Sequence, residues 1–445
     1  MSDQPCVRAV VVDYDGGDLV RRSVGALLAT DWPADRFEVV VVDNGSRVAV
    51  EERLGPYWGR VSVIRSAWNR GFAGGNNLAL ADLDGVDAVA LVNNDVTVDP
   101  SWLRPLVDVL FADSRVGAVC PKLLLDGTYR RLDLATTAER PWPLDRRPRG
   151  IRLLEVRALD HGAWQPASGV RLASGFYEPQ VRGGAWSCWS MPSATLYVPA
   201  VHGTGGDHAG RVRLVIDAAR AKPLELRSGA ACTTVELRPG VHPYEVELAA
   251  PPIELVNNVG TVLLANGYAA DRGWLEPDEG QFDAPTDVWA WSGGAVLLRA
   301  DYLRAVGLFD ERLFLYYEDF ELAWRGRRRG WRYRYAPASV ARHLHAATAV
   351  QDSPQSRYYN ERNRLLVLLR HASWTAFAGA LGRFMTTTLS YVRRDLIAPP
   401  LRGGRPDVSI VAARLRALGG FVVRAPGMLR SRWRTAMGPD QRYQR

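Results

Sequence analysis

The sequence predicts an α/β fold: a Rossmann-like, mostly parallel sheet that is interrupted by an all-β piece and followed by a basic helical tail. Buried-strand and helix patterns alternate over residues 7–125, which is typical of a parallel sheet with right-handed crossovers. Short alternating runs between Pro- and Gly-rich turns replace that pattern over residues 127–255. Helical periodicity then returns and continues into an Arg-rich C-terminal segment.

The first half contains five apolar runs of strand length. They occupy residues 7–12, 37–42, 61–64, 88–92 and 116–119. After the first run, Val20, Val24, Leu27 and Leu28 follow the i, i+4, i+7, i+8 spacing of one helix face. Residues 1–126 are therefore expected to form the first half of the α/β domain.

The residue pattern changes over residues 127–255. Short runs in which apolar and polar residues alternate predict a β-sandwich-like module there. These runs lie at residues 195–198, 212–216, 233–237 and 241–248. Helical patterns resume around residues 302–306 and 319–328. The β-rich piece is therefore expected to be inserted in one α/β domain, whose second half spans residues 256–370.

Positive charge is concentrated near the C-terminus. The chain of 445 residues has a net charge of +8, and residues 371–445 contain 13 Arg, three Asp and no Lys or Glu, a net of +10. Such a tail predicts an anionic partner surface, either lipid headgroups or nucleic acid. An apolar helical stripe in the tail could lie in a membrane interface or pack on the protein itself. The stripe consists of Val411, Leu415, Leu418 and Val422.

The composition argues against several protein classes. The 47% hydrophobic fraction is ordinary for a folded protein. Cys6, Cys120, Cys188 and Cys232 show no CxxC spacing, which argues against a zinc site or a disulfide framework. No apolar run reaches the roughly 18 residues that a membrane span needs. The scattered cysteines favour a reduced cytosolic compartment, and no signal segment is predicted before the first strand-like run.

Polar side chains follow three of the predicted strands at their carboxyl ends. Asp13 and Asp15 follow the first, Asp-Asn-Gly-Ser at residues 43–46 follows the second, and Asn-Asn-Asp at residues 93–95 follows the fourth. Because the carboxyl ends of parallel strands meet at one edge, these loops are expected to form a pocket. Their oxygen ligands suit a hard divalent cation held against a diphosphate.

A glycine-rich segment, residues 69–77, follows the third strand. Its Gly71, Gly74 and Gly75 permit close backbone approach, as a nucleotide would require. Neither GxGxxG nor GxxxxGK[ST] occurs, which argues against a dinucleotide-binding fold and a P-loop NTPase.

The second half supplies acids and histidines. Glu318, Asp319 and Glu321 begin a predicted helix after several aromatic residues. Helix capping explains one acid, whereas a general base in a stacking site explains the set better. His343 and His345 share one face of an extended segment, so one of them could ligate a metal. A structural role for these histidines is the alternative.

Six motifs in order resemble those of family 2 glycosyltransferases, and most closely the rhamnosyltransferase-like bacterial cell-surface branch. The motifs are V-V-D-N-G-S, N-R-G-F-A-G-G-N-N, L-V-N-N-D-V, G-G-A-V-L-L-R, F-L-Y-Y-E-D-F-E-L and Y-Y-N-E-R-N-R-L. The resemblance covers residues 7–126 and about 256–370. It implies a GT-A fold, a nucleotide-sugar donor, a divalent cation (Mg²⁺ or Mn²⁺) and inversion at the anomeric carbon.

Carried onto this chain, the resemblance implies roles for individual residues. The donor-binding residues would be Asp13, Asp15, Asp43, Asn69, Arg70, Gly71, Asn93 and Asn94. Asp95 would ligate the metal together with His343 or His345, although Asn93 departs from the family's DXD pattern. Asp319 would be the catalytic base, with Glu318 a close alternative. The acceptor-side residues would be Trp291, Gly293, Gly294 and Tyr317.

The main hypothesis is an inverting transferase that uses a UDP- or dTDP-sugar and extends a cell-wall or polyprenyl-linked glycan. We expect it to be cytoplasmic and peripheral at the inner face of the plasma membrane, held to anionic lipid by residues 371–445. The insertion would recognise the acceptor or act as a scaffold, and its Trp186 and Trp189 could stack on sugars or belong to its core.

Two other hypotheses remain. One is a non-catalytic glycan-binding scaffold. The other is a sugar nucleotidyltransferase, which is disfavoured because the acidic first loop, residues 13–18, is unsuited to a triphosphate. Nucleic-acid binding is not expected, since aromatic residues are sparse among the tail arginines.

Overall fold

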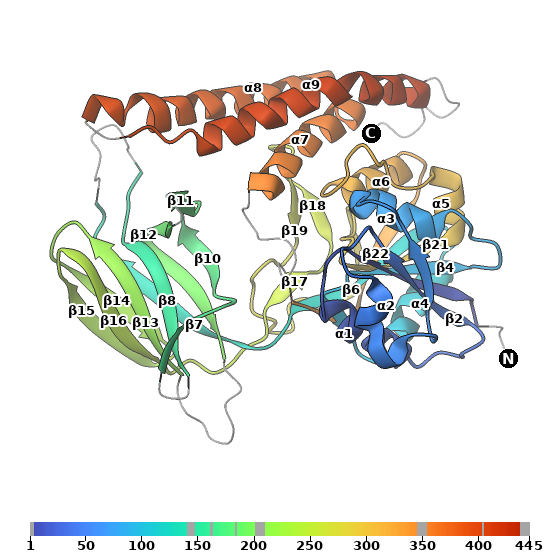
Figure 1. Cartoon of the computed structure of the whole chain (residues 1–445), viewed down its shortest axis with the longest axis horizontal. Coiled ribbons are helices and arrows are strands. Elements are labelled where there is room, and N and C mark those ends of the chain that lie inside the picture. Colours follow the sequence, from blue (N-terminus) through green and yellow to red (C-terminus); the bar gives the residue numbers. More distant parts are fainter. Residues whose placement is uncertain are drawn as a thin grey trace. The chain divides into compact units, whose positions relative to one another are not determined.

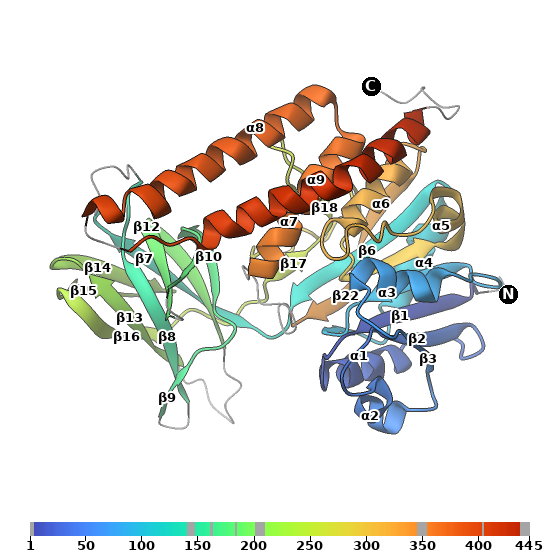
Figure 2. The same cartoon turned by 45° about the horizontal axis from the view of Figure 1, so that its top comes forward.

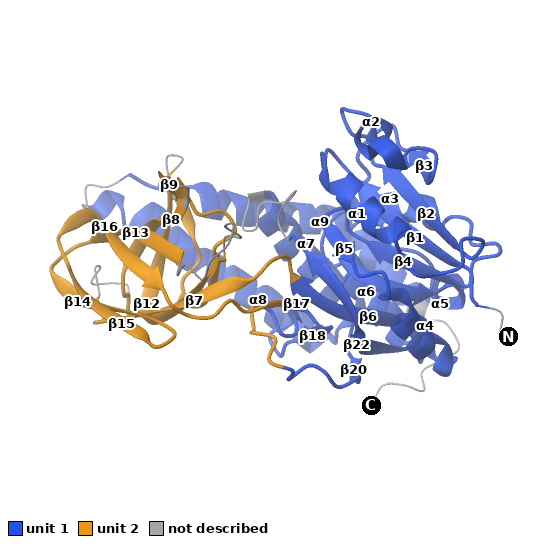
Figure 3. Ribbon diagram, turned by 90° about the horizontal axis from the view of Figure 1, so that it is seen from below, with its two compact units in different colours: residues 1–124, 257–274, 280–445 blue, residues 125–256, 275–279 orange. Residues whose placement is uncertain are grey.

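The computed structural model describes residues 4–139, 147–160, 163–182, 185–200, 210–344, 354–402 and 405–436. The chain divides into two compact units (Figure 3). Unit 1 comprises residues 1–124, 257–274 and 280–445, and unit 2 comprises residues 125–256 and 275–279. The predicted fold class is confirmed, because unit 1 is α/β with a helical C-terminal region and unit 2 is built of strands (Figure 1).

The first part of unit 1 alternates strands and helices. Its elements are β1 (Val7–Asp13), α1 (Leu19–Leu28), β2 (Phe37–Asp43), α2 (Val50–Leu54), β3 (Ser62–Arg65), α3 (Gly71–Leu80), β4 (Ala88–Val92), β5 (Val96–Val98), α4 (Leu103–Ala112) and β6 (Val116–Leu125).

After unit 2 the chain completes the same sheet and adds helices. These elements are β17 (Val256–Asn258), β18 (Thr261–Leu263), β19 (Ala269–Asp271), β20 (Thr286–Val288), β21 (Ala295–Arg299), α5 (Ala300–Val306), α6 (Glu318–Arg327), β22 (Arg332–His343), α7 (Pro354–His371), α8 (Trp374–Tyr391) and α9 (Ser409–Ala436).

The sheet of unit 1 has the strand order β20-β22-β6-β21-β4-β1-β2-β3, with β5 paired to β22. Strand β1 is parallel to β2 and β4, and β2 is parallel to β3. Strand β21 is instead antiparallel to β4 and β6, so the sheet is mixed where the sequence predicted a mostly parallel one. The reason is that residues 291–294 enter β21 from the carboxyl edge of β4, which makes β21 run back along its neighbour.

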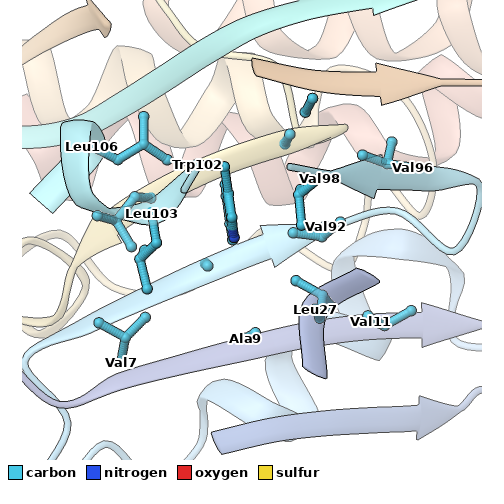
Figure 4. Close-up of a cluster of buried hydrophobic side chains, with 14 of the residues drawn as sticks. Val7, Ala9, Val11, Leu27, Val92, Val96, Val98, Trp102, Leu103 and Leu106 are labelled. Carbon is cyan, nitrogen blue, oxygen red and sulfur yellow. The ribbon is translucent and has the colours of Figure 1, made fainter. Parts of the chain in front are cut away.

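The core of unit 1 lies between the sheet and its helices (Figure 4). Strand β4 is buried along its whole length, as expected for a strand covered on both faces. The predicted apolar face of α1 contributes Val20, Val24 and Leu27, each with no exposed surface. Trp102 is also fully buried and donates from Nε1 to the Thr30 hydroxyl at 3.0 Å.

Unit 2 contains ten strands among its described residues. They are β7 (Tyr129–Thr136), β8 (Arg152–Asp160), β9 (Ala163–Pro166), β10 (Arg171–Phe176), β11 (Gln180–Arg182), β12 (Ala185–Pro199), β13 (Gly210–Ala218), β14 (Lys222–Ser228), β15 (Ala231–Leu237) and β16 (Gly240–Leu248). Residues 195–197 of the long strand β12 pair with β7 on one edge and with β10 on the other, and its residues 188 and 189 pair with β8. The strands enclose one apolar core. Trp186 is 37% exposed, so it is not a core residue.

The C-terminal helices belong to unit 1, where α7 and α9 lie side by side (Figures 1 and 2). No helix of the described residues has the length and apolarity that a membrane crossing requires. The predicted stripe of α9 does not form a single face. Val411 is 4% exposed, whereas Leu415 and Val422 are 55% and 60% exposed. The buried face consists of Val411, Ala417, Phe421 and Met428.

Candidate active site

Three loops follow β1, β2 and β4 at the carboxyl edge of the sheet, and we call residues 13–16, 43–47 and 93–95 the edge loops. A buried contact joins the first and third of them. Asn94 Nδ2 donates a 2.6 Å hydrogen bond to Asp13 Oδ1. Gly16 permits this approach, because a Cβ there would lie 2.2 Å from Asn94 Nδ2. Burial raises the pKa of the Asp13 carboxyl, and the bond from Asn94 partly opposes that effect.

The second edge loop holds the glycine-rich segment before α3. Asn44 is buried, and its Nδ2 donates to Asn69 Oδ1 at 3.2 Å and to the Gly71 carbonyl oxygen at 3.0 Å. Its Oδ1 accepts the Arg70 N–H at 2.9 Å. A single side chain therefore fixes the three predicted donor-binding positions 69–71, although Asn44 itself was not among the predicted site residues.

The aspartates of the first two edge loops hold the backbone around them. Buried Asp43 accepts the Ser46 N–H at 2.9 Å through Oδ1. Asp15 accepts the Arg47 N–H and Arg47 Nε, each at 2.9 Å, and these bonds hold the pKa of the Asp15 carboxyl below its ordinary value. Asp13 and Asp43 are as buried as core residues. A ligand would therefore contact the loop backbone that these carboxylates hold in place.

His343 lies beside Asp95 because β22 pairs with β5, with His343 opposite Val96 in register. His343 Nε2 is 3.0 Å from Asp95 Oδ1, and its Nδ1 is 3.0 Å from Asn257 Oδ1. With the Asn257 oxygen as acceptor, Nδ1 carries the proton and the Nε2 lone pair faces the carboxylate. Two acceptor atoms at this distance need a proton or a cation between them.

This pair of side chains fits a divalent cation that is shared with a diphosphate. One carboxylate and one imidazole suit Mn²⁺ or Mg²⁺ when phosphate oxygens and water supply the other ligands. Within the described ranges, no group of three or more His, Cys, Asp or Glu side chains is arranged to hold a metal ion. His345, the other predicted ligand, lies outside the described residues.

Two acids begin α6, and their environments differ. Glu318 is 4% exposed, and its Oε2 has no hydrogen-bond partner among the described residues. Asp319 is half-buried; its Oδ2 accepts the Gly293 N–H at 2.9 Å and its Oδ1 accepts the Phe320 N–H at 2.6 Å. Burial raises the pKa of both carboxyls, and the charge of Asp319 raises that of Glu318 further. Asp319 is therefore the acid that is ionised first and that solvent reaches.

The segment before α6, residues 313–317, is a strained loop that we call the left-handed loop. Three of its residues have positive φ angles, a conformation that costs about 1–3 kcal/mol for each non-glycine residue. They are Phe314, Tyr316 and Tyr317, at 67°, 68° and 71°. Gly71 allows the loop to lie on the start of α3, since a Cβ at Gly71 would be 2.2 Å from the Phe314 carbonyl oxygen.

Helix α7 holds the left-handed loop from behind. Asn363 has no exposed surface, and its Nδ2 lies within hydrogen-bonding distance of three carbonyl oxygens of the loop. These belong to Leu313, Leu315 and Tyr316, at 2.9, 2.8 and 2.7 Å. Arg362 adds a 2.6 Å bond from Nη2 to the Leu313 carbonyl oxygen. The Y-Y-N-E-R-N-R-L motif thus positions the segment that leads into Asp319.

Two consecutive glycines connect the acid of α6 with the third edge loop. The Gly293 N–H binds Asp319, and the Gly294 carbonyl oxygen accepts the Asn93 N–H at 3.0 Å. A Cβ on Gly293 would lie 2.8 Å from the Phe72 ring, so the position favours glycine. Asp95 follows Asn93 by two residues, which brings Asp319 and the Asp95–His343 pair to one site.

The two predicted acceptor-side aromatics make contacts within the protein. Trp291 has no exposed surface and packs edge-on against Phe309 at 6.2 Å between ring centroids, so in this structure its ring belongs to the core. Tyr317 is half-buried, and its hydroxyl accepts the Ala269 N–H at 3.3 Å. Its role in the structure is to join the left-handed loop to β19.

Two family models match the chain. The model "Glycosyl transferase family 2" matches residues 9–162, and the model "Glycosyl transferase family group 2" matches residues 219–411. The chain belongs to glycosyltransferase family 2. It is accordingly an enzyme that transfers a sugar, and the predicted resemblance is confirmed at the level of the family.

Curated relatives are similar over part of the chain. The O-antigen biosynthesis protein RfbC of Myxococcus xanthus is 36% identical over 131 residues, which are 28% of this chain and 10% of that protein. Putative cellulose synthase 2 of Komagataeibacter xylinus is 34% identical over 114 residues, 25% of this chain and 7% of that protein. The matched part thus spans a tenth or less of these relatives.

Among solved structures, GalNAc-T7 with UDP, GalNAc and Mn²⁺ aligns with 94% of this chain and 55% of its own, at 13% identity and a TM-score of 0.47. Residues 1–349 of TarS from S. aureus align with 98% of this chain and 93% of their own, at 12% identity and a TM-score of 0.39.

Several residues of this transferase site were missed by sequence reasoning. Asn257 orients His343, Asn363 holds the left-handed loop, and Asp271 lies close enough to Asp319 and His343 for their charges to act on its pKa. Asn257 and Asp271 lie in a segment without a recognised motif. Asn363 lies in a motif that was recognised, but the motif gave no indication of what the side chain contacts.

Proposed function

We propose that the enzyme transfers a sugar, with inversion, from a UDP- or dTDP-sugar to a hydroxyl of a cell-wall or polyprenyl-linked glycan, with Asp319 as the base. The observation that carries this proposal is the pair of glycines between the acid and the metal-binding strand. Gly293 binds Asp319, and Gly294 binds the strand end that carries Asp95. A base and a diphosphate-binding pair held at one site are what a single displacement needs.

In the proposed reaction, the acceptor oxygen attacks the anomeric carbon from the face opposite the nucleotide. The new C–O bond forms as the bond to the β-phosphate oxygen breaks, and the electron pair leaves with the nucleoside diphosphate. Asp319 takes the proton of the acceptor hydroxyl. Its ionised form is stabilised by the N–H groups of Gly293 and Phe320, and burial raises the pKa of the neighbouring Glu318 carboxyl.

The Asp95–His343 pair would hold Mg²⁺ or Mn²⁺. When bound, that cation would neutralise charge on the leaving diphosphate. Asn257 supports the pair, because with its Oδ1 as acceptor for Nδ1–H of His343, Nε2 would be the atom that ligates the cation. The edge loops fix the backbone of positions 69–71 beside α3, where the nucleoside would lie.

A thermal-shift panel tests this proposal directly. A ligand that binds only the folded state raises the melting temperature. UDP, dTDP, GDP and their sugars are each tested with and without Mn²⁺ or Mg²⁺, and nucleotide release is then measured for the donors that bind. Metal-dependent stabilisation by UDP or dTDP is expected. Stabilisation by nucleoside triphosphates alone would favour a nucleotidyltransferase, and no response would favour a glycan-binding scaffold.

The proposed membrane partner is anionic lipid at the inner face of the plasma membrane, contacted by the outer face of α9. Leu415, Val422 and Trp433 are 55%, 60% and 57% exposed. Their spacings of 7 and 11 residues return to the same side of a helix with about 3.6 residues per turn. Exposed Arg416 and Arg430 flank this side, which suits a headgroup layer of opposite charge.

Vesicle sedimentation tests the membrane proposal. The wild-type protein should sediment with phosphatidylglycerol-containing vesicles and much less with phosphatidylcholine alone. The triple variant Leu415→Ser, Val422→Ser, Trp433→Ser should lose this binding, whereas Trp58→Ser, which alters a residue of 56% exposure on the α/β part of unit 1, should keep it. Unchanged sedimentation of the triple variant would show that α9 is not the contact surface.

A further inference from the structure

A third carboxylate, Asp271, lies at the transfer site without a role in the reaction described above. It is the last residue of β19, and the residue is exposed to solvent. Asn258 Nδ2 donates a 2.6 Å hydrogen bond to Asp271 Oδ1. No hydrogen bond from the described residues reaches Oδ2. One oxygen is therefore fixed by the protein, and the other is available to a ligand.

Backbone contacts tie β19 to the catalytic segment on two sides. The Ala269 N–H, two residues before Asp271, donates to the Tyr317 hydroxyl, two residues before Asp319. Thr261 pairs with Asp271 across the β18–β19 hairpin and also exchanges backbone bonds of 2.9 and 3.1 Å with Ala290, three residues before Gly293. The backbone contacts that position Asp319 therefore also position Asp271.

Strand β17 ties Asp271 to the metal-binding pair as well. Its neighbouring residues Asn257 and Asn258 bind His343 and Asp271, respectively. The pKa of Asp271 is raised to about 6, mainly because the surrounding protein removes water from its carboxylate, and the charges of Asp319 and His343 also act on it. The side chains of these three residues therefore lie near one another.

On the basis of the proposed transferase function, we infer that Asp271 binds a hydroxyl group of a sugar at the reaction centre. The fixed Oδ1 and the available Oδ2 present a carboxylate acceptor of defined orientation, which suits the O–H donors of a sugar ring. With Asp271, Asp319 and Asp95 around one centre, an anionic group such as a uronate would be repelled there. The sugar that Asp271 binds is accordingly a neutral, hydroxyl-bearing one, in either the donor or the acceptor.

Steady-state kinetics of Asp271→Asn and Asp271→Ala test the inference. The donor is the one that the nucleotide panel identifies, and nucleotide release is measured with water alone and then with a series of neutral methyl glycosides as acceptors. Asp301→Asn, at a solvent-exposed position of α5, is the matched control. Melting temperatures of all variants establish that they are folded, and binding of the free nucleoside diphosphate should match the wild-type protein.

The two sources of the hydroxyl give different results. If Asp271 binds the acceptor, both variants raise the KM for the glycoside by about tenfold or more, while release with water stays normal. If it binds the donor sugar, the donor KM rises in both reactions. Wild-type values of both KM in a folded variant, or a fall in kcat alone, would overturn the inference. A wild-type protein that releases no nucleotide from any donor would refute the proposed function instead, and the inference with it.

Discussion

Asn44 in the edge loops and Asn363 behind the left-handed loop are both buried asparagines that hold a functional segment in place. The partners of Asn44 are 25 to 27 residues away in sequence and belong to the next strand–helix connection. Those of Asn363 are 47 to 50 residues away, on the far side of β22. The edge loops also keep mostly ordinary backbone angles, whereas the left-handed loop contains three strained residues.

The difference in sequence separation and in backbone angles indicates that the two halves of the site are stabilised in different ways. The edge loops follow from strand order, because neighbouring parallel strands bring their carboxyl ends together. The left-handed loop would not keep its conformation by itself, and the bonds from α7, each worth about 1 kcal/mol net, offset its strain. The proposed nucleotide side thus depends on strand order, whereas a distant helix positions the proposed base.

The largest expected effect is at the base itself. Asp319→Asn should lower kcat by about 10³-fold, within the range that general base catalysis contributes, while nucleoside diphosphate binding stays near normal. Glu318→Gln is the matched control, because burial favours the protonated form of Glu318, which Gln resembles, and this variant should keep activity within a few-fold. If Glu318→Gln abolished transfer and Asp319→Asn did not, the two roles would have to be exchanged.

The second effect concerns the Asp95–His343 pair. Asp95→Ala should abolish the Mn²⁺-dependent part of the thermal shift produced by UDP or dTDP, and Asn257→Leu should weaken it by about 10–100-fold in metal affinity, because His343 would lose its orienting acceptor. Titration of Mn²⁺ at fixed nucleotide measures both. Unchanged metal dependence in Asp95→Ala would remove this pair from the metal site.

The comparison between the two asparagines can be tested with a pair of variants. Asn363→Ala should lower kcat by about 10- to 100-fold with a normal nucleotide Kd, since it releases the loop that positions Asp319. Asn44→Ala should instead raise the nucleotide Kd, since it releases positions 69–71. Melting temperatures of both variants report any general loss of stability. Identical kinetic profiles for the two variants would show that the site responds as one unit.

The smallest effect is on stability as a function of pH. Burial raises the folded-state pKa of the Glu318 carboxyl above its ordinary value. Its contribution to stability is therefore present below the unfolded-state pKa and is lost as pH rises through the folded-state pKa. Glu318→Gln lacks this loss, so its free energy of unfolding should exceed that of the wild-type protein increasingly as pH rises. Urea unfolding at several pH values measures the difference, and a constant difference would contradict it.

The fold class, the five N-terminal strands, the β-rich insertion and the family could all be predicted from the sequence alone. These features depend on the spacing of hydrophobic residues and on the order of motifs, and both can be recognised within short stretches of sequence. The sequence also identified Asp95, His343 and Asp319 as candidates, because oxygen and imidazole ligands after buried strands and acids at a helix start have few other uses.

Which side chains meet, by contrast, depends on pairings between distant segments and could not be predicted from the sequence. The antiparallel entry of β21 and the pairing of β22 with β5 bring residues 293 and 343 beside residue 95, and no local pattern encodes those pairings. The location of Trp291 could not be predicted either, because an apolar ring can stack on a sugar or pack in a core. In the structure Trp291 is fully buried in the core. Asn257, Asp271 and Asn363 have ordinary local surroundings, and their roles arise from contacts between segments that are distant in sequence.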